Sequence, residues 1–246
     1  MWLLAFKKIF VKREFMMWSQ LIIWPLYSLA FSIIMFGSYH GLYMTPADVT
    51  QGEVFRIIYI HVPMAALSMA LYLGMCFFVL LERGWHLKMA DQYALACAIV
   101  GSTITLLTII TGSIWAKPTW GTWWIWDARL TSEVILLVLF VSYWVIRAGI
   151  QPDVMAKEVS SYIALLGAIN IPFIHYSVQW WYTLHQGPTI LQFAKPKMPW
   201  IMLYPLICTG IGCILLCIGL VIHTAIVLVC RKSADSNEIK LSPKAK

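Results

Sequence analysis

The chain has 246 residues, of which 61% are hydrophobic and only 12% are charged, with a formal net charge of +7. A soluble domain of this size needs a charged surface that so few ionisable residues do not provide, and this excludes an ordinary soluble globular protein. We therefore expect a polytopic membrane protein, whose basic residues set its orientation in the bilayer and do not indicate binding to nucleic acid.

The first predicted element is a basic amphipathic helix over the segment MWLLAFKKIFVKREF, which we expect on the membrane surface. Six apolar segments follow, each close to the ~20 residues that a helix needs to cross the bilayer core. No small-residue cleavage site follows the first of them, so we expect a retained helix and not a signal peptide. The six segments cover residues 21–43, 57–81, 92–114, 130–147, 159–179 and 201–229.

The predicted fold is an all-α integral membrane protein with a single membrane domain over residues 1–230. Residues 231–246 are polar and are expected to form a disordered tail. With six spans, both termini lie on the side that holds loops 82–91 and 148–158. This side carries thirteen of the eighteen Lys and Arg residues, which places it in the cytoplasm and leaves three loops outside. The six cysteines lie in or at the end of spans without a C-x-x-C or C-x-x-C-H pattern, so we expect them to pack between helices.

The outer loop between the third and fourth spans has an unusual concentration of tryptophan, in the segment TWGTWWIWDARLT (residues 119–131). One interpretation is an interfacial belt, since tryptophan favours the headgroup region of a membrane. A belt would spread its members over both interfaces, whereas eight of the thirteen tryptophans fall on the predicted outer side. The other interpretation, a flat platform for a planar ligand, accounts better for the clustering. The predicted platform consists of Trp120, Trp123, Trp124, Trp126 and the adjacent Asp127.

Two outer histidines are candidate axial ligands of a haem iron, since neutral imidazole is a common ligand of that metal. His61 begins the second span in IYIHVPMA, and His185 lies in the third outer loop in WWYTLHQGP. They come from different segments and are expected to converge on the tryptophan loop. His40, at the end of the first span, and His175, deeper in the fifth, are second-rank candidates.

Two outer arginines are possible contacts for the haem propionates, because a guanidinium offers paired, permanently charged donors to a carboxylate. Arg56 precedes His61 by five residues, and Arg129 closes the tryptophan stretch. The alternative for each is an interfacial pairing with lipid phosphate. Asp127 is expected either to pair with Arg129 or to orient a ligand histidine.

The segment WGTWWIWDAR resembles the tryptophan-rich signature of the WWD family of haem-handling membrane proteins. Together with YIHVP, WWYTLHQG and the six spans, it is similar to the haem exporter protein C family, CcmC, of cytochrome c maturation. The resemblance implies a bacterial inner-membrane protein that binds haem b at the periplasmic face and presents it to a periplasmic haem chaperone, CcmE. It implies His61 and His185 as axial ligands beside the tryptophan platform. We expect a haem-handling subunit without a complete catalytic centre of its own, which assists covalent attachment of haem to the chaperone.

The resemblance also implies a complex with an ATP-binding subunit, a second membrane subunit and a small single-span subunit (CcmA, CcmB and CcmD). Two alternatives stay open. A haem permease would place broken helices or ionisable groups near the membrane midplane, and Pro63 and Pro172 are candidates to break helices. A b-type redox subunit would pair histidines inside the spans, and His175 has no obvious partner there.

Overall fold

The structure is a computed structural model that describes residues 11–181, 183–185 and 198–241, with side chains described up to residue 234. This part of the chain is helical, apart from short connections and an isolated β-bridge between Asp48 and Gly52. The elements in chain order are α2 (Lys12–Tyr39), η1 (His40–Met44), η2 (Glu53–Ile57), α3 (Ile58–Trp85), α4 (Lys88–Trp120), α5 (Ala128–Gly149), α6 (Asp153–Gly167), α7 (Asn170–Trp180) and α8 (Trp200–Leu241).

Within these residues, six helical segments are long and apolar enough to cross a membrane, and each predicted span lies inside one of them. The predicted all-α membrane fold is therefore confirmed. The segments are Lys12–Met44, Glu53–Trp85, Lys88–Trp120, Ala128–Gly149, Asp153–Trp180 and Trp200–Ala234.

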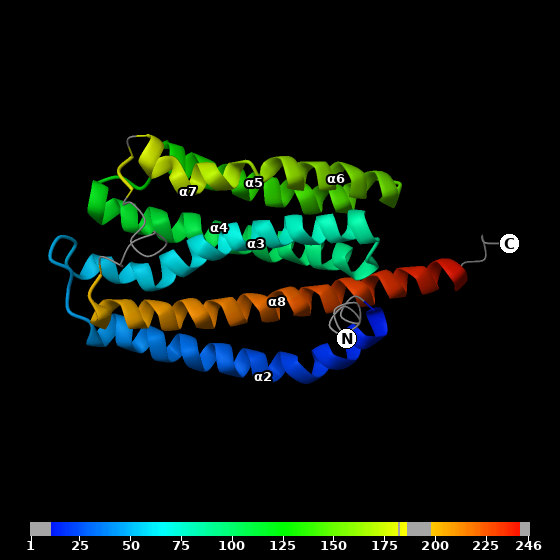
Figure 1. Cartoon of the computed structure of the whole chain (residues 1–246), viewed down its shortest axis with the longest axis horizontal. Helices are drawn as coiled ribbons and strands as arrows, with labels where there is room; N and C mark the ends of the chain where they lie inside the picture. The colour runs from blue at the N-terminus through cyan, green and yellow to red at the C-terminus, as the bar shows by residue number, and fades with distance from the viewer. Residues whose placement is uncertain (1–10, 182, 186–197, 242–246) are drawn as a thin grey trace.

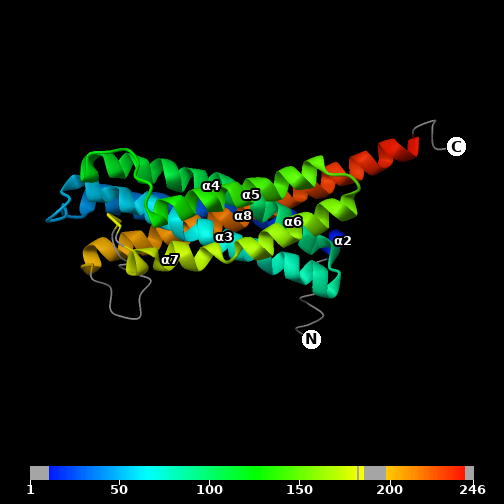
Figure 2. The same ribbon diagram turned by 90° about the horizontal axis from the view of Figure 1, so that it is seen from above.

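The helices run side by side along the long axis of the molecule (Figure 1). α2 packs along α8, α3 packs along α4, and α5 packs with α6 and α7 on the other side of the α3–α4 pair. The start of α2 and the end of α8 lie at the same end of the bundle, whereas η1 and the ends of α4 and α7 lie at the opposite end (Figures 1 and 2). An even number of spans produces this arrangement. The distribution of Lys and Arg predicts that the second end faces outward.

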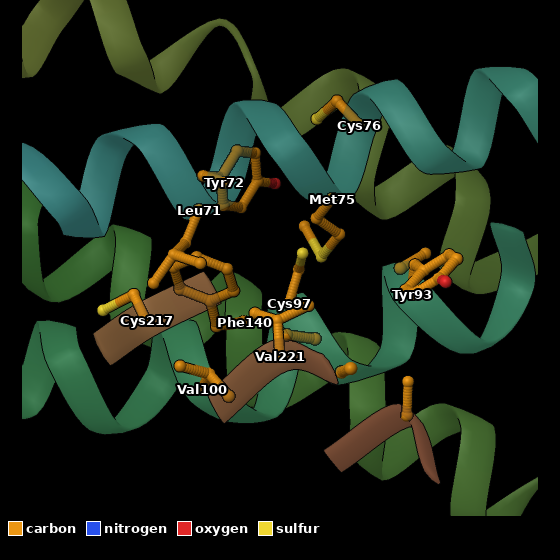
Figure 3. Packing of buried hydrophobic residues seen from close by; sticks show 14 of the residues in the cluster. Leu71, Tyr72, Met75, Cys76, Tyr93, Cys97, Val100, Phe140, Cys217 and Val221 are labelled. Carbon is orange, nitrogen blue, oxygen red and sulfur yellow. The ribbon is translucent and has the colours of Figure 1, made fainter. Parts of the chain in front are cut away.

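The centre of the bundle is packed with apolar side chains from α3, α4, α5 and α8 (Figure 3). Tyr72 and Phe140 meet edge to face with ring centroids 5.0 Å apart. Gly101 lies directly against the Phe140 ring, where a Cβ atom would clash, so this glycine allows α4 and α5 to approach closely. Cys97 and Cys217 are buried free thiols in the same cluster, as expected for a packing role.

The inner end of the bundle is held by a buried group of charges that joins α4, α5 and α6. Arg147 donates two hydrogen bonds to the two carboxylate oxygens of Asp91, at 2.6 and 3.0 Å. Lys157 forms a second ion pair with Asp91 at 3.2 Å. A paired guanidinium and carboxylate in this geometry compensates the cost of burying both charges.

The fifth span is broken in the membrane between α6 and α7. Pro172 has no N–H to donate to the carbonyl of Ala168, and its ring crowds that carbonyl, so a continuous helix is disfavoured. The Tyr72 hydroxyl and the Cys76 thiol donate to the Ala164 carbonyl at 3.1 and 3.2 Å. The Asn170 side-chain amide donates to the Ser132 carbonyl of α5 at 2.8 Å. Of the two candidate helix-breaking prolines, Pro172 interrupts its span, whereas Pro63 lies inside the continuous α3.

The structure differs from the sequence expectation at both ends of the chain. α2 already begins at Lys12, so residues 12–15 continue into the first membrane helix, and Phe15 is buried against Trp18 and Tyr93. The rest of the predicted surface helix, residues 1–10, lies outside the described residues. α8 continues to Leu241, so the expected disorder of the tail is wrong over residues 231–241, and residues 242–246 lie outside the described part.

Candidate functional site

A cavity lies near the outer end of the bundle, between α3, α4, α5 and the segment that follows α7. The space between its lining atoms, including the opening to solvent, is about 590 Å³. Most of the lining is apolar or aromatic. The polar and aromatic side chains that matter chemically are His61, Trp115, Trp120, Trp124, Arg129, Glu133 and His185.

His61 is buried in the cavity wall, with 6% of its surface exposed, and its ring is held in one orientation. The Thr111 hydroxyl donates to the Leu107 carbonyl at 2.7 Å, so its oxygen accepts from the Nδ1–H of His61 at 3.0 Å. This hydrogen bond leaves Nε2 as the nitrogen with a free lone pair, which is the form a metal ligand requires. Gly112 makes room for the ring, because a Cβ atom there would lie 3.0 Å from the His61 Cε1 atom.

His185 lies opposite His61 in the structure. Their ring centroids are 6.4 Å apart, with 38° between the ring planes. Two imidazoles bound to opposite sides of one metal, with metal–nitrogen bonds of about 2.0 Å, have ring centroids roughly 6 Å apart. The separation therefore suits a single iron held between the two rings.

Tryptophan rings surround this histidine pair. Trp115 lies edge-on to both histidines, with ring centroids 5.6 Å from His61 and 6.1 Å from His185, and Trp120 lies 6.2 Å from His185. Trp124 also lines the cavity, and its Nε1 atom is buried without a hydrogen-bond partner among the described residues. These three indoles provide flat apolar surface beside the proposed metal position.

The other two tryptophans of the predicted platform do not line the cavity. Trp123 is 57% exposed and Trp126 is 73% exposed. Trp126 packs edge-on against Trp124, with ring centroids 5.5 Å apart. The predicted platform therefore divides into an inner part, Trp120 and Trp124, and an outer part at the surface.

The two candidate arginines have different environments. Arg56 is engaged by protein acceptors, since it pairs with Glu53 and donates to the Gly41 carbonyl at 2.9 Å and to the hydroxyl and carbonyl of Thr45 at 2.7 and 2.9 Å. It fastens η1 to η2 and does not line the cavity. Arg129 does line the cavity, and among the described residues its side chain has no hydrogen bond or ion pair. The described residues therefore provide no hydrogen-bond acceptor for its five donors.

Two carboxylates accompany Arg129 on the same helix. Asp127 is the N-cap of α5, where its Oδ1 atom accepts from the backbone N–H of Leu130 at 2.8 Å. Its Oδ2 atom is buried without a hydrogen-bond partner among the described residues. Glu133, one turn beyond Arg129, lines the cavity and accepts a hydrogen bond from the Ser68 hydroxyl at 2.9 Å.

The second-rank histidines do not line the cavity. The Nδ1–H of His40 donates to the Phe36 carbonyl at 2.9 Å, within the helix end that contains it. His175 packs against its neighbour Tyr176, with ring centroids 4.7 Å apart. The structure thus separates these two from the pair formed by His61 and His185.

Sequence reasoning missed Thr111, Gly112, Trp115 and Glu133 as site residues. Helical periodicity offered a signal for all four. Thr108, Thr111, Gly112 and Trp115 recur at spacings of three and four, so they share one face of α4. Arg129 and Glu133 are also four residues apart on α5, so they share one face of that helix, and both line the cavity.

A second hollow lies on the other side of Trp115, Trp120 and His185, toward the outer loop 45–52. Its space, with its open side included, is about 750 Å³. The Trp115 Nε1–H donates to the Gln51 side-chain oxygen at 3.1 Å, which fixes this indole between the two spaces. The histidine and tryptophan wall is therefore approached from the outer end of the bundle as well as from between the helices.

Comparison with known proteins identifies the family of the chain. A family model described as "Heme exporter protein C" (CcmC) matches residues 5–240. Proteins named heme exporter protein C are similar to the chain: that of Escherichia coli is 45% identical over 152 residues, that of Haemophilus influenzae 39% identical over 180, and that of Bradyrhizobium diazoefficiens 37% identical over 183. These matches cover 62%, 73% and 73% of the chain, and 62%, 73% and 70% of the three relatives. The matched part thus spans less than two thirds of the Escherichia coli protein.

Proposed function

Since the chain belongs to the haem exporter protein C family, we propose that it binds haem at the outer face of the bacterial inner membrane and presents it to a periplasmic partner. His61 and His185 are the proposed axial ligands, on opposite faces of the macrocycle. Within this proposal the haem is haem b, held without a covalent bond to the chain.

The observation that carries this proposal is the 6.4 Å separation of two histidine rings contributed by different segments of the chain. Three further features support it. The Thr111 hydrogen bond leaves Nε2 of His61 for the metal. Trp115, Trp120 and Trp124 offer flat apolar surface to a porphyrin. Arg129 offers donors to a propionate in a place where no other described residue accepts them.

Bound haem supplies the iron and the reactive edge of the porphyrin, and the chain holds and orients them. The ligands come from the end of the bundle, since His61 lies in the first turn of α3 and His185 lies beyond α7. A soluble partner can reach an edge in this position, which suits presentation better than permanent storage. The exposed Trp123 and Trp126 lie at this end and are the proposed contacts for the chaperone CcmE.

The remaining partners of the proposal are an ATP-binding subunit, a second membrane subunit and a small single-span subunit. The family membership supports a multi-subunit assembly of this kind. In this arrangement the chain contributes the haem-binding surface and no complete catalytic centre of its own.

A second candidate function is a haem permease, and the broken fifth span favours it. Discontinuous helices and buried ionisable groups near the midplane are typical of transport pathways, and the break between α6 and α7 lies within the membrane. Uptake of labelled haem into sealed vesicles distinguishes the two functions. Presentation predicts haem bound at the outer face without accumulation in the lumen, whereas a permease accumulates it.

The direct test of haem ligation is a visible absorption titration of the purified protein with haem. We expect a low-spin spectrum of a six-coordinate iron in the parent protein, and loss or conversion of that spectrum in His61→Ala and in His185→Ala. His40→Ala and His175→Ala are matched controls and are expected to keep the parent spectrum. An unchanged spectrum in the double variant of His61 and His185 would refute the ligand assignment.

A further inference from the structure

Glu133 is a carboxylate inside the membrane that the proposed haem binding does not require. It is buried, with 8% of its surface exposed, on a helix that crosses the bilayer. A charged or acidic group in such a place is costly and is retained where it has a partner or a role. Ser68 is the hydrogen-bond partner of Glu133, and the basic residue Arg129 lies one turn away on the same helix and lines the same cavity.

The position of Glu133 relates it to the proposed iron. Ser68 lies seven residues beyond His61 on α3, which is about 10 Å along a helix axis, so Glu133 lies on the membrane side of the ligand. Arg129 lies one turn nearer the surface on α5. Arg129 and Glu133 are the two side chains with a formal charge in the lining of this cavity, as far as the described residues show.

Arg129 and Glu133 therefore place charges of opposite sign beside one cavity, and these charges have opposite effects on the oxidation state of an iron bound there. A ferric haem carries one more positive charge at its centre than a ferrous haem. A nearby carboxylate stabilises the ferric form, and a nearby guanidinium stabilises the ferrous form. The apolar surroundings strengthen both effects, because the Coulomb energy rises as the local dielectric constant falls.

We propose that Glu133 biases the haem held between His61 and His185 toward the ferric state, acting through its electric field and not through contact with the iron. This inference rests on the proposed haem site. The Ser68 hydroxyl holds the carboxylate in place by donating to it, and Arg129 compensates its charge while the cavity holds no haem. When a propionate pairs with Arg129, the positive charge of Arg129 compensates the propionate as well as Glu133. The electric field of Glu133 at the iron then increases.

The test is a potentiometric titration of the haem-loaded protein, following the absorption of the reduced form in the presence of redox mediators. We expect Glu133→Gln to raise the midpoint potential while the low-spin spectrum persists, because glutamine keeps an acceptor for Ser68 and removes the charge. Glu133→Asp keeps the charge and is expected to stay near the parent potential. Glu158→Gln, the same change at an exposed site on α6, is the matched control and is expected to leave the potential unchanged.

If the hydrogen bond between Ser68 and Glu133 had only a structural role, the midpoint potential would not depend on the charge of Glu133. The inference fails if Glu133→Gln has the potential of the parent while both bind haem with the same spectrum. Arg129→Gln provides an independent measurement and is expected to lower the midpoint potential, so an unchanged or raised value in that variant also contradicts the inference. Absence of haem binding in the parent would overturn the proposed function itself, and the inference with it.

Discussion

The two outer arginines show how one residue type takes two roles within the same end of the bundle. Arg56 pairs with Glu53 and donates hydrogen bonds to Gly41 and Thr45, so it stabilises the connection between the first two spans. Arg129 lies in the cavity wall without a hydrogen bond in the described part of the chain. We expect the first to matter for folding and the second for binding.

Replacing Arg129 with glutamine is expected to weaken haem binding roughly 10- to 100-fold, since a hydrogen bond to a charged group contributes about 1.5–3 kcal/mol. Arg56→Gln is the matched control, with the same change of charge. It is expected to lower the thermal unfolding temperature and to leave haem affinity near that of the parent. Haem titration and thermal unfolding in detergent measure both quantities. Equal losses of affinity in the two variants would contradict the separate roles.

Thr111→Val is expected to reduce haem affinity by roughly 10- to 100-fold, because outer-shell partners of metal-bound histidines have effects of this size. Valine keeps the shape of threonine but removes the oxygen that accepts from Nδ1 of His61. Thr103→Val on the same helix is a suitable control, since its hydroxyl bonds to the Ile99 carbonyl away from the cavity. Equal affinities in both variants would show that Thr111 does not set the histidine tautomer.

The sequence predicts individual site residues where their type alone is unusual. Histidines and arginines are rare in an apolar chain, so His61, His185 and Arg129 stand out, and the structure places all three at the cavity. Thr111, Gly112 and Trp115 lie in a helix where such residues are ordinary. They are recognised only from the packing of α4 against α3, which places them next to His61. The sequence also does not distinguish Arg56 from Arg129, because it does not show which of the two guanidinium groups has acceptors within the protein.

At the scale of elements, the start of α5 positions the charged part of the cavity. Asp127 caps this helix, and the carboxylate fixes the first turn, in which Arg129 lies. The preceding turn at Gly121 has a positive φ of 78°, which glycine adopts without strain, and it ends α4 so that the tryptophan segment can cross to α5. The position of Arg129 therefore depends on both helix ends.

Asp127→Ala is expected to destabilise the protein by about 1 kcal/mol, the usual cost of removing a helix N-cap. Asp127→Asn retains a capping oxygen and is expected to remain within a few tenths of a kcal/mol of the parent. Denaturant titration in detergent micelles compares the two free energies of unfolding. Equal losses in the asparagine and alanine variants would show that the charge of Asp127, and not its capping oxygen, stabilises this region, because both substitutions remove the charge.

Helix boundaries were the least predictable feature among the elements. Hydropathy marks the part of a helix that lies in the bilayer core, so it predicts the six spans but does not define where their helices begin and end. α2 and α8 both continue through polar residues, because a helix that is already formed extends more easily than it nucleates. The break in the fifth span was signalled by Pro172, although Pro63 gives a similar signal in the unbroken α3.

At the scale of the whole molecule, the outer end of the bundle contains the proposed binding site and the inner end contains stabilising ion pairs. The outer end contains the cavity, in which Arg129 has no ion pair with any described residue. The inner end contains Asp91 with Arg147 and Lys157, which compensate one another. This division predicts that stability and haem binding respond to substitutions at different ends.

Asp91→Asn is expected to destabilise the protein by about 3–5 kcal/mol, because it leaves the buried Arg147 guanidinium without its counter-charge. Asp153→Asn breaks the exposed pair with Lys232 and is expected to cost at most about 1 kcal/mol. Free energies of unfolding in detergent provide the comparison. Any folded Asp91→Asn protein is expected to keep the parent haem spectrum, and a changed spectrum would show that the two ends are coupled.

The most direct test of the haem site is an experimental structure of the haem-loaded protein at a resolution that locates the iron. We predict an iron between the rings of His61 and His185, with the macrocycle beside Trp120 and Trp124 and a propionate on Arg129. An iron bound to His40 or His175, or a haem held outside this cavity, would contradict the assignment of the site.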